Sequence, residues 1–85
     1  GSYDFMSITG PQIAAARTLL RISAQTVADA ASVGLATVRR AEASEGVPKI
    51  TAANLNAIRR ALEVAGVEFI PENGGGAGVR LRKET

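Results

Sequence analysis

The chain contains no cysteine, no histidine and no tryptophan, and aromatic residues make up only 4% of its 85 residues. Without cysteine there is no disulfide and no thiol chemistry. Histidine and cysteine are the usual zinc ligands, and histidine is the commonest general base, so both chemistries lose their ordinary residues. A chain of this length holds one small domain with little volume for a deep cleft. We therefore expect no enzyme, no metal site and no cofactor.

Long apolar runs are also missing. The apolar stretches are interrupted by Arg, Asp or Glu well before the roughly 18 residues that a membrane span needs. We expect a cytoplasmic protein without a membrane segment. Residues Gly1 to Phe5 are interpreted as a remnant of recombinant expression ahead of a start at Met6, and we expect no part of the fold from them. The main domain is expected over residues 6–66, with residues 67–85 as a short β appendage.

The net charge of +2 is unevenly distributed. Residues 9–66 carry seven Lys or Arg against four acids, whereas the basic and acidic residues of the tail balance. A mildly basic helical part suits a polyanionic partner, although many ordinary domains carry as much charge. Arg59 and Arg60 are expected on the outer side of the last helix, where local pairing with Glu63 explains them.

Caps and apolar spacing predict four helices. Thr9 can cap the first helix with Gln12 reaching back to it, and Pro11 lies in the first turn, where its missing N–H costs nothing. Ser23 is a good N-cap for a second, short helix that runs to about Ala31. The start of each of these helices is therefore marked by a side chain that satisfies free backbone N–H groups.

Breaks in the pattern separate the later helices. Residues 32–34 interrupt it before a third helix over about residues 35–43, and residues 46–48 form a loop. Thr51 caps the fourth helix, and Gly66 is placed to end it in the left-handed conformation. The apolar stripe of the fourth helix consists of Leu55, Ile58, Leu62 and Ala65.

The tail changes character. Residues 67–70 and 79–82 are short strand patterns, and the glycine-rich residues 71–78 between them predict a flexible hairpin loop. This loop is not a phosphate loop, because no Lys-Ser/Thr pair follows it. Each strand has one apolar face, which must meet the fourth helix or a second subunit, and we favour the second subunit. The sequence leaves open whether the strands pair within one chain or between two.

The central run from Ser23 to Glu42, SAQTVADAASVGLATVRRAE, contains two short helical patterns joined by a three-residue turn. Small residues stand where the two helices would cross, which is typical of helix-turn-helix geometry. The run resembles the repressor/Cro-type (xenobiotic-response-element-like) helix-turn-helix family of DNA-binding proteins. With the flanking helices the resemblance covers about Thr9 to Gly66, and it implies a mainly α, four-helix, lambda-repressor-like domain. The matching positions are Val27-Ala28, Ser32-Val33, Thr37-Val38 and Glu42.

The third predicted helix has an outward face that suits base recognition. With about 100° per residue and Val38 facing inwards, Ala36 and Arg40 point almost directly outwards. Thr37 and Arg39 flank them. Arginine can bind guanine O6 and N7 together, and an Ala, Leu or Thr methyl group can meet the thymine methyl. The predicted base-reading residues are Leu35, Ala36, Thr37, Arg39 and Arg40.

Two charged residues are expected to belong to the scaffold instead. Arg17 and Glu42 both fall on the inward sides of their helices, where either charge alone would be costly. The family pattern pairs an Arg of the first helix with a Glu that closes the third, and both residues stand at the matching positions. We therefore interpret Arg17 and Glu42 as a structural ion pair.

Phosphate contacts are expected beside the base-reading helix. The start of the second helix has free N–H groups that can bind one backbone phosphate. The family pattern usually places a Gln directly after the cap, but here Ala24 holds that position and Gln25 follows it. Either Gln25 or Thr26 then takes the phosphate role. Lys49, in the loop after the third helix, is the other predicted phosphate ligand.

Together these features predict a sequence-specific regulator of transcription, an operator-binding repressor that acts on double-stranded DNA as a homodimer. The C-terminal tail is the expected dimerisation element. One alternative is an antitoxin with the same fold, which would co-purify with a second protein. Another is a protein-interaction module, which would give a featureless binding isotherm with duplex DNA at low salt.

Overall fold

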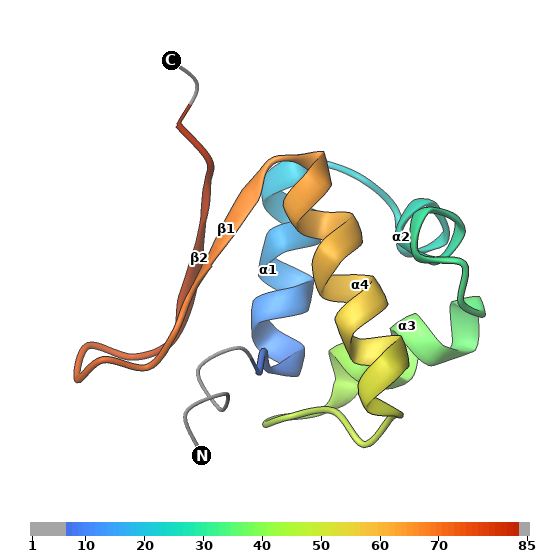
Figure 1. The fold of residues 1–85 in the computed structure, drawn as a ribbon, viewed down its shortest axis with the longest axis horizontal. Helices are drawn as coiled ribbons and strands as arrows, with labels where there is room; N and C mark the ends of the chain where they lie inside the picture. The colour runs from blue at the N-terminus through green and yellow to red at the C-terminus, as the bar shows by residue number, and fades with distance from the viewer. Residues whose placement is uncertain (1–6, 84–85) are drawn as a thin grey trace.

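The computed structural model describes residues 7–83 as four α-helices followed by one antiparallel β-hairpin (Figure 1). The prediction of a mainly helical chain with a C-terminal strand pair is therefore confirmed. The proposed expression remnant, Gly1 to Phe5, and the proposed start at Met6 lie outside the described residues. The elements are α1 (Gly10–Leu20), α2 (Ala24–Ala31), α3 (Leu35–Ala43), α4 (Ala52–Ala65), β1 (Val67–Ile70) and β2 (Gly78–Leu81).

Three helices begin at the hydroxyl caps that the sequence predicts. The backbone N–H of Gln12 donates to Thr9 Oγ1 at 3.3 Å, and the backbone N–H of Thr9 donates to Gln12 Oε1 at 2.9 Å. Ser23 and Thr51 each accept a hydrogen bond from the backbone N–H three residues further on. Gly66 ends α4 with a φ of 127°, a conformation that glycine adopts without strain. Capping thus fixes where the helices start and where the last one stops.

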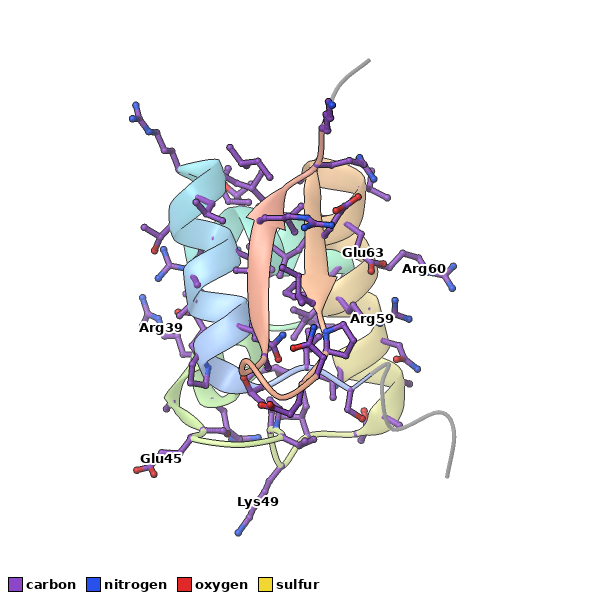
Figure 2. All side chains as sticks on the ribbon, turned by 90° about the vertical axis from the view of Figure 1, so that its left-hand side faces the viewer. Arg39, Glu45, Lys49, Arg59, Arg60 and Glu63 are labelled. Carbon is purple, nitrogen blue, oxygen red and sulfur yellow. The ribbon has the colours of Figure 1, made fainter. Side chains whose placement is uncertain are left out.

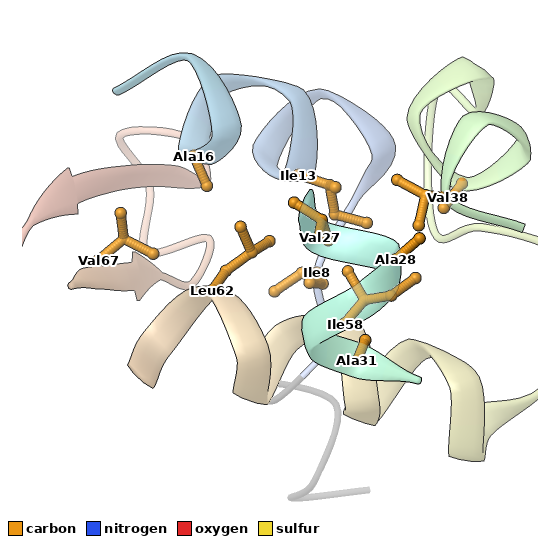
Figure 3. Packing of buried hydrophobic residues seen from close by; sticks show 11 residues of the cluster. Ile8, Ile13, Ala16, Val27, Ala28, Ala31, Val38, Ile58, Leu62 and Val67 are labelled. Atoms are coloured by element: carbon orange, nitrogen blue, oxygen red, sulfur yellow. The ribbon is translucent and has the colours of Figure 1, made fainter. Parts of the chain in front are cut away.

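One apolar core lies between the helices and the hairpin (Figure 3). On α4, Ile58 and Leu62 are fully buried as predicted, and Leu55 is half-buried. The prediction for Ala65 is wrong, because it lies exposed in the last turn, where the chain leaves the helix and Val67 enters the core instead. The buried apolar residues are Ile8, Ile13, Ala16, Val27, Ala28, Ala31, Val38, Ala41, Ile58, Leu62 and Val67.

The start of α1 lies directly against the end of α3 at Gly10. The backbone N–H of Gly10 donates to the carbonyl oxygen of Gly46 at 3.0 Å, just after α3. A Cβ atom at Gly10 would overlap the backbone carbonyl oxygens of Ala41 and Ser44. The absence of a side chain therefore allows the two helices to meet backbone to backbone.

The hairpin packs on the helices of its own chain. β1 and β2 pair antiparallel, with Val67 opposite Leu81 and Phe69 opposite Val79. Val67 is 1% exposed, and Phe69 and Val79 pack against the core. The expectation that a second subunit covers this apolar face is therefore wrong for most of the face. Most of it packs against α1 and α4 of the same chain. Leu81 remains 54% exposed.

A buried glutamine ties the hairpin to α1. Gln12 Nε2 donates to the carbonyl oxygen of Gly78 at 2.9 Å and to that of Ile70 at 3.3 Å. Because these carbonyls close the loop end of the hairpin, both strands are held to the first turn of α1. Strand β2 begins at Gly78 and ends at Leu81, so both of its ends lie one residue earlier than predicted.

Within residues 7–83, no helix combines the length and apolar character needed to cross a lipid bilayer.

Candidate nucleic-acid interface

Helix α3 has one fully buried side and one exposed side. Val38 and Ala41 are 0% exposed in the core. On the opposite side Ala36, Arg39 and Arg40 are exposed, and Arg39 projects from the surface (Figure 2). The outward orientation derived from the helical wheel therefore agrees with the structure. Within residues 7–83, neither exposed arginine forms an ion pair.

The two remaining base-reading candidates are less accessible. Thr37 is half-buried, and Leu35 is half-buried because it packs against the core. Leu35 is the first residue of α3 and directly follows the turn that connects α2 to α3. The structure thus gives Leu35 a packing role in addition to any outward contact.

The turn between α2 and α3 is short and strongly constrained. Ser32 caps α2 in the left-handed conformation with a φ of 57°. The backbone N–H of Val33 then donates to the carbonyl oxygen of Ala28 at 3.0 Å. Gly34 is the N-cap of α3, and its carbonyl oxygen accepts from the backbone N–H of Thr37 at 3.0 Å. Each turn residue is hydrogen-bonded to a helix end, so α3 is held at a fixed angle to α2.

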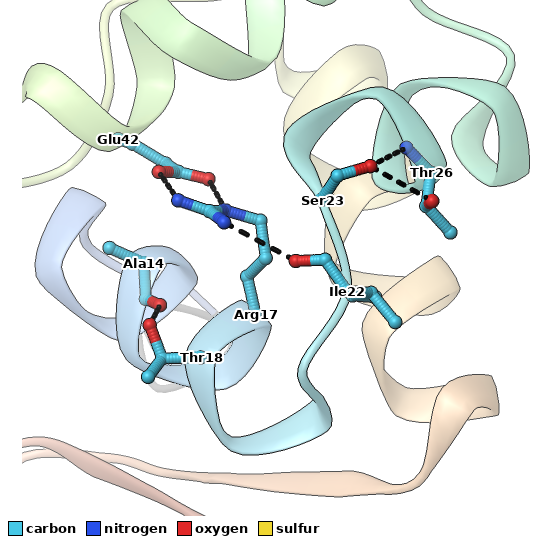
Figure 4. Close-up of polar contacts among 7 residues, drawn as sticks. All are labelled: Ala14, Arg17, Thr18, Ile22, Ser23, Thr26 and Glu42. Atoms are coloured by element: carbon cyan, nitrogen blue, oxygen red, sulfur yellow. Dashed lines mark hydrogen bonds and ion pairs between the residues drawn. The ribbon is translucent and has the colours of Figure 1, made fainter.

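A bidentate ion pair fixes α3 to α1. Arg17 Nε donates to Glu42 Oε2 at 2.7 Å, and Arg17 Nη2 donates to Glu42 Oε1 at 3.0 Å (Figure 4). Arg17 Nη1 also donates to the carbonyl oxygen of Ile22 at 3.3 Å, which attaches the segment before α2. The ion pair predicted from the sequence is therefore present, and one guanidinium joins three segments of the scaffold.

The pair lies at the edge of the core rather than inside it. The side chain of Arg17 is 29% exposed and that of Glu42 is 15% exposed. The hydrogen bond to Glu42 raises the pKa of the Arg17 guanidinium, against the smaller opposing effect of burial. Arg17 thus stays charged at any ordinary pH, and water still reaches part of the pair.

The first turn of α2 carries the two candidate phosphate ligands, and each already has a local partner. Gln25 Nε2 donates to Asp29 Oδ1 at 2.9 Å. The hydroxyl oxygen of Thr26 lies 3.0 Å from Ser23 Oγ. Both side chains are exposed at the start of the helix, which has a partial positive charge. Asp29 follows Gln25 by four residues, a spacing at which two side chains meet on the surface of a helix.

A hollow of about 420 Å³ joins α3 to the start of α4. Arg40 and Lys49 both line it, so the structure brings together a predicted base reader and a predicted phosphate ligand. Lys49 extends from the loop away from the body of the molecule (Figure 2). Sequence reasoning missed Thr51 and Asn54 as members of this site, although the cap at Thr51 marks the helix start. The lining residues are Thr37, Arg40, Lys49, Ile50, Thr51 and Asn54.

The arginine pair of α4 and the glycine-rich loop lie outside this interface. Arg59 is not on the outer side of α4, because its side chain is 15% exposed and pairs with Glu63 at 3.0 Å beside the hairpin. Arg60 is exposed as predicted. The glycine-rich loop is closed from within, since Glu72 Oε2 accepts from the backbone N–H groups of Gly74 and Gly76, both at 3.0 Å.

Comparison with known proteins adds no relative. No protein-family model matches the chain, and no curated protein matches it significantly.

Proposed function

We propose that this chain is a sequence-specific double-stranded DNA-binding regulator of transcription, an operator-binding repressor with a lambda-repressor-like arrangement. The observation that carries the proposal is the two-sided character of α3. Val38 and Ala41 anchor one side in the core, and the other side presents Arg39 and Arg40, which form no ion pair within residues 7–83. An exposed pair of unpartnered arginines on a rigidly held helix suits recognition of a polyanion.

The dimensions of a helix support reading in the major groove. An α-helix with its side chains is about 10–12 Å wide, and the major groove is about 12 Å wide. Arg40 lies opposite the buried Val38, so it would point to the base edges and bind guanine O6 and N7 together. Ala36 would meet a thymine methyl group beside it. Arg39 and Thr37 flank this line and extend the contacted surface.

Phosphate contacts would follow on both sides of α3. Lys49 and the start of α4 border the hollow beside Arg40, so one phosphate can lie between a lysine and the positive end of a helix. The start of α2, with Gln25 and Thr26, offers the corresponding contact on the other strand. The hydrogen bond between Gln25 and Asp29 would have to open for Gln25 to bind phosphate. The hydroxyl of Thr26 needs less rearrangement, because it can accept from Ser23 Oγ and still donate its own hydrogen to a phosphate.

The size of the molecule suits two copies on adjacent half-sites. Half-sites of helix-turn-helix dimers are about 34–36 Å apart, which is one turn of DNA. The chain measures 33 × 33 × 18 Å along its principal axes. Two copies side by side on one face of the duplex would place their α3 helices in successive major grooves. A homodimer on a palindromic operator is therefore the working arrangement.

The decisive experiment is the selection of bound duplexes from a random pool, followed by binding titrations at several salt concentrations. We expect an enriched motif with two half-sites one helical turn apart, and affinity that falls as salt rises. The motif should be lost when Arg39 and Arg40 are both replaced by alanine. An unenriched pool and a featureless isotherm at low salt would overturn the proposal.

A further inference from the structure

The loop that joins β1 to β2 contains an asparagine followed by a glycine. Asn73 is exposed, as is every residue of the segment 71–77, and this loop extends away from the helices (Figure 1). Of the three asparagines in the chain, only Asn73 precedes a glycine. An asparagine side chain can react with the backbone nitrogen of the next residue, and a glycine leaves that nitrogen unhindered because it has no Cβ atom. Asn73 is therefore the asparagine of this chain that is most open to such a reaction.

A hydrogen bond within the loop arranges the Asn73 side chain for this reaction. The backbone N–H of Gly75 donates to Asn73 Oδ1 at 3.2 Å. This bond closes an Asx turn, which folds the side chain back over its own backbone and brings Cγ towards the nitrogen of Gly74. The same donor stabilises the negative charge that Oδ1 gains when a nucleophile adds to Cγ.

A carboxylate holds the attacking nitrogen. The backbone N–H of Gly74 donates to Glu72 Oε2 at 3.0 Å. The backbone N–H of Gly76 donates to the same oxygen at 3.0 Å, which keeps the carboxylate inside the turn of the loop. A carboxylate that accepts from the attacking N–H is placed to remove its proton as the new bond forms, which is the role of a general base.

We propose that Asn73 is a modification site, at which the loop converts its own asparagine into a succinimide and then into an acid. The nitrogen of Gly74 forms a bond to Cγ of Asn73 and gives its proton to Glu72. The bond between Cγ and Nδ2 breaks, and ammonia leaves with the proton that Glu72 returns. Water then opens the ring at either carbonyl, which gives aspartate or isoaspartate. Water is the only co-reactant, and no atom is oxidised or reduced.

The conversion changes the charge of the loop and leaves the core intact. A carboxylate in place of the Asn73 amide subtracts one from the formal net charge of +2 and leaves +1. The hydrogen bonds that tie the hairpin to α1 accept at the carbonyls of Ile70 and Gly78, outside the exposed segment 71–77. The modified chain should therefore keep its fold. The reaction requires no DNA, so it does not depend on the proposed function.

The two other asparagines provide a comparison within the same molecule. Asn54 and Asn56 lie in α4, and each is followed by a residue that has a Cβ atom. The backbone N–H of Leu55 donates to the carbonyl oxygen of Thr51 at 2.9 Å. A nitrogen held in the helix in this way cannot turn towards the side chain before it, so Asn54 and Asn56 should remain intact.

The reaction is tested by incubating the folded protein at mildly alkaline pH and mapping its peptides by mass spectrometry, with isoaspartate counted by enzymatic methylation. We expect the succinimide and its two hydrolysis products at Asn73 and none at Asn54 or Asn56. Glu72→Gln retains a hydrogen-bond acceptor but loses the base, so it should slow the conversion in the folded protein by at least about tenfold. In concentrated urea, where the loop is unfolded, the parent and Glu72→Gln should convert at the same rate.

The matched control is Glu68→Gln, which removes an acid from β1 outside the loop and should leave the rate at Asn73 unchanged. Circular dichroism and the melting temperature should be the same for the parent and for Glu72→Gln. Equal or faster conversion in folded Glu72→Gln would overturn the proposal. So would an Asn73 that stays intact in the folded parent but converts in urea, because the loop would then protect the side chain.

Discussion

Two identical Arg-Arg pairs show how much the fold decides about a single residue. Arg39 and Arg40 are both exposed on α3 and form no ion pair within residues 7–83. On α4 the second pair is divided, since Arg59 is mostly covered beside the hairpin and bonded to Glu63, whereas Arg60 is exposed (Figure 2). All four side chains have the same chemistry. The position of each on its helix decides whether it is free to contact a partner molecule or is used within the fold.

Replacing Arg40 by alanine should cost about 1–3 kcal/mol of specific binding and relax the choice of one base pair, because a bidentate contact to guanine is lost. The measurement is a fluorescence anisotropy titration of the selected duplex and of its single-base variants. Arg60→Ala is the matched control, as it removes another exposed arginine, from a helix that is not proposed to read bases. If specific affinity is unchanged in a folded Arg40→Ala protein, Arg40 is not a base reader.

Replacing Lys49 by alanine should weaken binding to all sequences about equally. The lost phosphate contact should also reduce the slope of log affinity against log salt by roughly one. Titrations of specific and random duplexes over a range of salt concentrations measure both effects. Glu45→Ala, on the same exposed loop, removes an acid and should not reduce affinity. A loss confined to the selected duplex would instead make Lys49 a base reader.

At the scale of elements, two ion pairs join neighbouring elements: Arg17–Glu42 joins α1 to α3, and Arg80–Glu68 joins β2 to β1. The Arg17–Glu42 and Arg80–Glu68 pairs have nearly the same length, 2.7 and 2.8 Å. Their surroundings differ, because the side chains of the first pair are 29% and 15% exposed and those of the second are 68% and 43% exposed. Solvent screens the second pair much more, so only the first is expected to hold elements together.

Glu42→Ala should therefore lower the free energy of unfolding by about 1.5–3 kcal/mol, the usual range for hydrogen bonds to charged groups. The remaining Arg17 would lose its partner in a partly covered position. Glu68→Ala is the control and should cost only about 0.2–1 kcal/mol, as exposed pairs do. Urea unfolding of both variants gives the comparison. A Glu42→Ala protein as stable as the parent but unable to bind DNA would give Glu42 a direct role in recognition.

The elements were largely predictable because their signals are local. Thr9, Ser23 and Thr51 mark helix starts through hydrogen bonds made within three residues, and Gly66 marks an end through a positive φ that other residues rarely adopt. The ion pair of Arg17 and Glu42 was predictable from the inward direction of both side chains and from the resemblance that places an Arg and a Glu at these two positions. Local chemistry of this kind can be recognised without knowledge of the tertiary structure.

The remaining features depend on contacts between distant segments. The burial of Arg59 and the packing of Phe69 follow from where the hairpin lies on α1 and α4, which no local pattern indicates. The membership of Asn54 in the hollow beside Arg40 depends on the path of the loop that precedes α4. The apolar face of each strand was recognised, but its partner could be found only from the assembled helices.

At the scale of the whole molecule, the hairpin is part of the core and not a detachable tail. Val67 is fully buried, and the buried Gln12 uses the hairpin carbonyls of Ile70 and Gly78 as acceptors. A domain of this size has a total stability of about 5–15 kcal/mol at most. Loss of the hairpin removes several apolar contacts and leaves Gln12 unsatisfied, so the helices alone have little stability left.

Deletion of residues 67–85 should accordingly give a protein that is largely unfolded rather than a stable monomer. Loss of the buried Val67 side chain alone accounts for about 1.5–3 kcal/mol, and an unsatisfied buried polar group costs about 1–3 kcal/mol more. Circular dichroism and thermal melting measure the effect. Deletion of residues 83–85 alone is the control and should melt like the parent. A cooperative melt of the longer deletion near the parent temperature would show that the helices fold without the hairpin.

The close approach at Gly10 has a consequence for how the gene can vary. Every amino acid other than glycine has a Cβ atom, so each missense mutation of this codon forces α1 away from the carbonyl oxygens of Ala41 and Ser44. The next residue, Pro11, and Ala15 on the same helix are exposed and lie under no such restriction. In a randomised library selected for folding, survivors should keep glycine at this codon while the two exposed codons diversify.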